Sequence, residues 1–141
     1  MSLRQEAEAL FFGVGVQELY GHWSWADRGS MFIRFGEWEP GQAPDTWAYR
    51  VHAPHPLDSD RRIDKVITYS VLYTAAELIA YENADTEKPF HPPSEETGRA
   101  CSMWVFSDEL GTFDPHTLDQ VLQVAVFGGV KYPHFEPRNR G

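Results

Sequence analysis

The chain has 141 residues and a formal net charge of −9, from 12 Lys and Arg against 21 Asp and Glu. This length suits one domain that buries its core without disulfides or metals, and the 42% apolar content is too high for a disordered chain. The negative charge argues against a general affinity for nucleic acid or anionic membranes, which attract cationic surfaces. The charge permits a protein partner with a basic surface, and a solvated surface explains the same acids.

The single cysteine, Cys101, excludes an intramolecular disulfide and a zinc site built from several cysteines. The first ten residues lack the apolar core of a signal peptide, and no run approaches the roughly 18 apolar residues of a membrane span. We therefore expect a cytoplasmic protein, with one α+β domain over residues 1–131 and an irregular tail over residues 132–141.

In the first half of the chain, residues 2–10 have the apolar spacing of a helix. Residues 19–25 and 30–36 alternate apolar and polar side chains and predict a hairpin, whose turn includes Gly29. Residues 46–52 alternate in the same way and predict a third strand.

Residues 62–72 carry conflicting signals. Ile63, Ile67 and Val71 fit helical spacing, whereas the β-branched and aromatic residues over 66–71 favour a strand. We predict a strand, because a capping box starting at Thr74 announces a later helix that runs to about residue 83.

Towards the C-terminus, residues 85–98 predict a proline-bearing loop and the apolar run 100–107 a strand in the middle of the sheet. Asp114 and Pro115 then begin a last helix, and Gly128 ends it. The resulting order is α-β-β-β-β-α-β-α, an antiparallel sheet of about five strands with helices packed on one face.

Strand alternation suggests a cationic patch. If the first three strands are in-register neighbours, their aromatic and aliphatic residues share the core face. The opposite face then carries His22, Ser24, Arg34, Arg50 and His52. Two alternatives remain open for this face. It could hold an anionic small molecule, with the arginines binding the anion and a histidine as general base, or it could be a solvated face whose arginines pair with nearby acids.

An aromatic residue among acids forms a second candidate. Trp38, flanked by Glu37 and Glu39, resembles an interface anchor with a charged rim. A lid on the core explains the same pattern equally well.

The sequence gives less support to a metal site or to a catalytic nucleophile. His52 and His55 are three residues apart, but the prolines beside His55 keep the backbone extended, so we expect no metal site. Cys101 with His116 and Asp114 could form a nucleophilic set, yet Cys101 lies in an apolar run typical of buried, inert cysteines. We also expect no cofactor, since no phosphate-binding glycine motif is present.

Two functions follow. The favoured one is a non-catalytic protein-binding module, such as an inhibitor, immunity-type antagonist, chaperone or adaptor, that uses acidic and aromatic surface and could also form a homodimer. The alternative is a small enzyme or ligand-binding protein that uses the His/Arg face of the sheet for an anionic small molecule.

Overall fold

The computed structural model of the chain describes residues 6–7, 10–11, 25, 31–34, 47–58 and 60–133. The chain is α+β, as predicted, but the predicted element order and the five strands are wrong for this described part. Its elements are, in chain order, β1 (Met31–Arg34), β2 (Trp47–Pro54), β3 (Arg62–Ile67), α3 (Tyr69–Ala80), α4 (Glu95–Ser107) and α5 (Pro115–Phe127).

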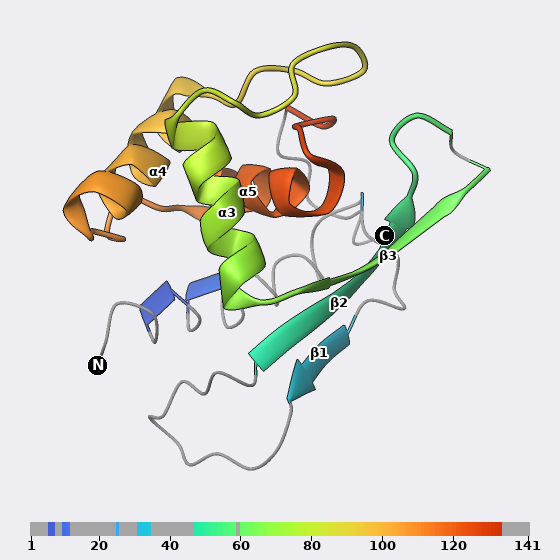
Figure 1. Cartoon of the computed structure of the whole chain (residues 1–141), viewed down its shortest axis with the longest axis horizontal. Helices are drawn as coiled ribbons and strands as arrows, with labels where there is room; N and C mark the ends of the chain where they lie inside the picture. The colour runs from blue at the N-terminus through green and yellow to red at the C-terminus, as the bar shows by residue number, and fades with distance from the viewer. Residues whose placement is uncertain are drawn as a thin grey trace, which may run out of the picture.

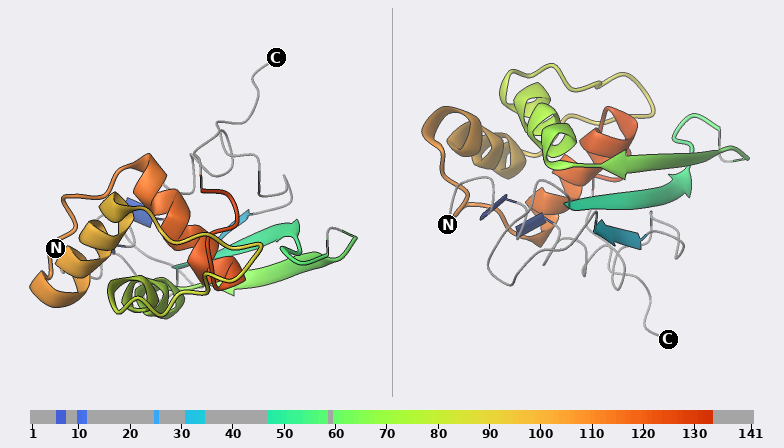
Figure 2. Two further views of the ribbon diagram at one scale, coloured as in Figure 1. Left: turned by 90° about the horizontal axis from the view of Figure 1, so that it is seen from above. Right: turned by 60° about the horizontal axis from the view of Figure 1, so that its bottom comes forward.

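The three strands form one antiparallel sheet in the order β1-β2-β3. Figure 1 shows the helices gathered at one end of this sheet, with the β2–β3 hairpin extending past them. Figure 2 (left) shows α5 between α4 and the sheet. β2 confirms the strand expected over residues 46–52. β1 pairs with β2. Of the strand predicted over residues 19–25, residues 19–24 lie outside the described residues, and Trp25 lies in a bend.

The boundary between β3 and α3 corrects the strand predicted through residue 72. β3 ends at Ile67, and the hydroxyl of Thr68 caps α3 by accepting a hydrogen bond from the backbone N–H of Val71 at 3.4 Å. The predicted capping residue, Thr74, lies inside the helix. The helix forms because packing of side chains at helical spacing outweighs the strand preference of the β-branched residues in this segment. The buried residues of α3 are Leu72, Ala75, Ala76 and Ile79.

The predicted strand over residues 100–107 is also wrong, because this run belongs to α4. Ser94 caps the helix by accepting a hydrogen bond from the N–H of Thr97 at 3.2 Å, and Glu95 and Glu96 stand in its first turn, where the helix dipole favours acids. Its buried residues recur with a period of three to four, which the apolar run concealed. They are Thr97, Ala100, Cys101 and Trp104.

The last helix, α5, confirms its predicted ends. Asp114 and Thr117 form a reciprocal capping box, and Gly128 closes the helix with φ +86°. Ten consecutive residues, from Thr117 to Val126, are buried, so α5 is the central helix of the core.

Polar side chains on α5 hold the segment that follows it. The Gln123 amide donates to the carbonyl of Tyr132 at 2.9 Å and accepts from the N–H groups of Lys131 and Tyr132. It also donates to Asp119, which accepts a second bond from the indole N–H of Trp25. Burial raises the pKa of Asp119 to about 7, although both hydrogen bonds lower it.

A close backbone contact fixes the loop between α3 and α4. The N–H of Asp85 donates to the carbonyl of Gly128 at 3.0 Å, and the N–H of His91 donates to Val130 at 2.7 Å. A Cβ atom on Gly129 would lie 2.6 Å from the carbonyl oxygen of Asp85 and 2.7 Å from the ring of Phe90. The loop therefore packs against bare backbone at residue 129.

Candidate functional site

The strand register divides the predicted cationic patch. Arg34 pairs with Trp47 and Met31 pairs with Arg50. Residues directly opposite each other occupy the same face, and successive residues alternate. The positions of Arg34 and Arg50 therefore belong to opposite faces, which corrects the placement expected from alternation alone. His22 and Ser24 lie outside the described residues.

Arg50 and His52 do lie together, but an acid joins them. Nε of Arg50 is 2.9 Å from Oδ1 of Asp64 on β3, and Nδ1 of His52 is 3.6 Å from the same oxygen. The arginine and aspartate side chains are nearly half exposed, and they line neither of the two hollows described below. This geometry agrees with the solvated-face interpretation of the patch.

The nucleophilic set fails on the environment of its thiol. Cys101 is fully buried, and burial raises its pKa to about 12, so the thiol stays protonated near neutral pH. The Asp114 carboxylate caps α5, where it accepts the N–H of Thr117 at 2.9 Å. Neither group is available for the chemistry that the set requires.

An exposed aromatic pair lies on the helical layer instead. Tyr81 follows the last turn of α3 and Phe106 lies in the last turn of α4. Each residue is 57% exposed. Their ring centroids are 5.2 Å apart and the ring planes are almost perpendicular, at 86°. Large apolar side chains exposed together mark interaction sites more often than scattered ones do.

Acidic groups border this pair. The pKa of the Tyr73 hydroxyl is raised by burial and then by the charges of Glu77 and Asp108 and by Tyr81, so both acids lie in the vicinity of the Tyr73 hydroxyl. We call Tyr73, Glu77, Tyr81, Phe106 and Asp108 the aromatic–acidic surface. The charge of the surrounding region agrees, because residues 69–114 contain nine acids against two bases, Lys88 and Arg99.

The aromatic–acidic surface rests on a packed support. The Tyr73 ring meets Trp104 edge to face, with centroids 5.4 Å apart. Trp104 is fully buried and also contacts Phe11 and Phe113. A rigid support lowers the entropy lost when a partner binds, since the exposed rings are already held in place.

A hollow of about 360 Å³ opens on the same pair of helices, between the end of α3 and the start of α4. Its apolar walls include Ile79, Ala84 and Pro93, and its acids are Glu82 and Glu95. Lys and Arg side chains combine an aliphatic stem with a cationic head, so they match this lining. The hollow therefore favours the same kind of partner as the neighbouring surface.

The sequence interpretation missed Tyr81 and Phe106. The signal was available, because Phe106 precedes Asp108 and Glu109 just as Trp38 stands among Glu37 and Glu39. It was hidden by the strand assigned to residues 100–107, since a helix puts Phe106 away from the buried Trp104. Trp38 and its two acids lie outside the described residues.

The described residues contain no group of three or more His, Cys, Asp or Glu that could hold a metal ion. No helix among them combines the length and the apolar character needed to cross a membrane. Comparisons with models of protein families, with curated proteins and with solved structures found no match.

Proposed function

We propose that this protein is a non-catalytic binding module that holds a cationic segment of another protein on its aromatic–acidic surface. The observation that carries the proposal is the exposed pair of Tyr81 and Phe106, on a surface where the acids Glu77 and Asp108 lie in the vicinity of Tyr73. Aromatic rings attract Lys and Arg through their π faces, and the carboxylates accept charge-assisted hydrogen bonds.

Two further observations support a basic partner. The hollow with Glu82 and Glu95 lies on the same two helices and suits a Lys or Arg side chain. The concentration of acids over residues 69–114 would speed association with a basic surface and make the rate depend on salt.

Affinity capture from source-cell lysate, followed by titration of the captured protein, tests the proposal. We expect a partner that salt releases and that binds Phe106→Ala at least roughly 30-fold more weakly, the loss typical of an aromatic hot spot. Leu57→Ala is the matched control, because Leu57 is an exposed apolar side chain, 68% exposed, on the β2–β3 hairpin. Equal binding to both variants contradicts the proposal.

The acidic contribution needs its own variant. Asp108 has φ +54°, a conformation that Asn tolerates, so Asp108→Asn removes the charge and preserves the backbone. We expect weaker salt dependence of binding. Self-association is the competing occupant of this surface, and a dimer in light scattering that Phe106→Ala dissociates would replace the basic partner with a second copy.

A further inference from the structure

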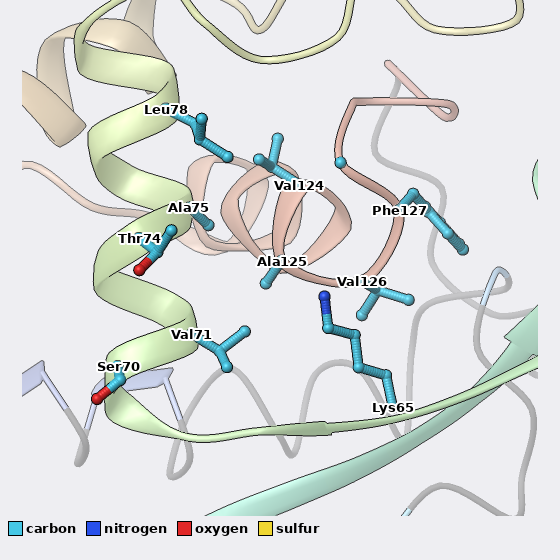
Figure 3. Close-up of a pocket in the computed structure, with 11 residues that line it drawn as sticks. Lys65, Ser70, Val71, Thr74, Ala75, Leu78, Val124, Ala125, Val126 and Phe127 are labelled. Atoms are coloured by element: carbon cyan, nitrogen blue, oxygen red, sulfur yellow. The ribbon is translucent and has the colours of Figure 1, made fainter.

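A second hollow, of about 490 Å³, lies on another side of α3 (Figure 3). β3, α3 and the last turn of α5 border it, and it is open to solvent. Val71, Ala75 and Leu78 face it from α3, and Val124 and Val126 line it from α5. This volume is within the range of small-molecule sites, which are mostly apolar with few polar groups.

Lys65 is the unexpected member of the lining. It pairs with Val51, which is fully buried, and it stands between Ile63 and Ile67 on the core side of β3. Apolar side chains normally occupy such positions. Val66, on the outer face, is 37% exposed. Lys65 itself is exposed, between the half-buried Ile63 and the buried Ile67, so its side chain stands at the edge of the core.

The ammonium group of Lys65 extends from β3 into the hollow (Figure 3). Among the described residues that line the hollow, Lys65 alone carries a charge. It makes no hydrogen bond or ion pair with any residue that the structure describes. A cation at the wall of an apolar hollow, without a partner among the described residues, matches a ligand that has an acid at one end and an apolar body.

The last turn of α5 supplies a competing explanation. A helix C-terminus carries partial negative charge, and a nearby lysine stabilises it modestly. That role accounts for the direction of Lys65, which points towards Ala125 and Val126 in Figure 3. It does not account for the hollow, because a dipole contact needs no apolar walls beside it.

We propose that this hollow binds an amphipathic carboxylate, with its aliphatic chain between α3 and α5 and its carboxylate on Nζ of Lys65. The apolar walls remove the chain from water, and the ammonium pairs with the carboxylate through a charge-assisted hydrogen bond. The site is separate from the aromatic–acidic surface and does not depend on the function proposed for it.

Calorimetric titration of the full chain with decanoate and with decanol tests the site. The two ligands have chains of equal length, so their difference isolates the carboxylate. We expect decanoate to bind at least about tenfold more tightly than decanol. Lys65→Met keeps an unbranched side chain and removes the charge, so decanoate should fall to the affinity of decanol while decanol is unchanged.

Two further variants complete the design. Val71→Glu introduces an acid into the half-buried wall and should abolish binding of both ligands, with circular dichroism verifying the fold. Lys88→Met removes an exposed cation outside the hollow and should change neither affinity. The proposal is overturned if neither ligand binds wild type, if both bind equally, or if Lys65→Met binds decanoate as wild type does.

Discussion

Two sides of α3 present opposite chemistry. Tyr73, Glu77 and Tyr81 follow one another at intervals of four residues and form an aromatic, anionic row, whereas Val71 and Leu78 line an aliphatic hollow that has one cation. Residues four apart share a helix face. A single helix thus separates a surface suited to basic groups from a hollow suited to an acid.

The difference shows how little a net charge says about a local site. A charge of −9 permitted a basic partner for the chain as a whole. Such a partner fits the aromatic–acidic surface but not the hollow, where the charge is positive. The two sites should therefore respond to different variants.

The largest expected effect concerns what lies beneath each site. The aromatic–acidic surface rests on uncharged rings around Trp104, whereas the hollow is lined by α5, which carries the buried Asp119. The pKa of Asp119 is raised from 3.8 to about 7 in the folded protein. Its contribution to stability is complete below about pH 4 and is lost as pH rises through 7, a total of about 4 kcal/mol at 1.4 kcal/mol per pKa unit.

Asp119→Asn isolates this contribution, because the amide does not titrate. In urea unfolding from pH 4 to 8, the free energy of unfolding of wild type should decline relative to that of the variant. Other acids affect both proteins and cancel in the difference. If the free energies of unfolding of wild type and variant change with pH in parallel, the pKa of Asp119 is not raised in the folded protein, and the prediction is wrong.

A smaller effect is expected when the core side of α3, the helix that both sites share, is weakened. Leu72 is fully buried on the core side of α3. Leu72→Ala should lower the free energy of unfolding by about 3 kcal/mol through the cavity it leaves, as measured by urea denaturation. Ser70→Ala, at an exposed position of the same helix, should change it by less than about 0.5 kcal/mol.

At temperatures where Leu72→Ala stays folded, partner binding and decanoate binding should both remain close to wild type. Loss of one without the other would show that α3 does not hold the two sites as one rigid support. The two sides of α3 would then behave as independent regions.

The smallest effect concerns the sheet face. Asp64→Asn removes the acid from Arg50 and His52, and we expect a loss of less than about 1 kcal/mol because the ion pair is exposed. Denaturation at low and high salt measures it. If the unpaired arginine then binds small anions tightly, the sheet-face alternative regains support. Unchanged anion binding agrees with a solvated face.

Local backbone signals made part of the fold predictable. Asp114, Pro115 and Gly128 mark the ends of α5, since caps act on neighbouring N–H and C=O groups whatever the rest of the chain does. The alternation over residues 46–52 located β2 for a similar reason. The α+β class followed from these elements without knowledge of the contacts between them.

The wrong or missing predictions concern features that depend on contacts between residues far apart in the sequence. Residues 100–106 and 69–71 have compositions that suit either state, and packing among α3, α4 and α5 decided for helix. The face of Arg34 depends on its pairing with Trp47, which alternation within β1 does not contain. Lys65 joins a hollow only because β3, α3 and α5 come together, and the pair of Tyr81 and Phe106 forms only where two helices meet.

The contact at Gly129 has a consequence for natural variation. A methyl group there would overlap the carbonyl of Asp85 and the ring of Phe90, so any other residue must displace the loop that carries Thr86, Pro92 and Pro93 along the acidic hollow. Related chains that keep this hollow should therefore retain glycine at position 129. A relative with a side chain there identifies a lineage in which this loop, and whatever it binds, has diverged.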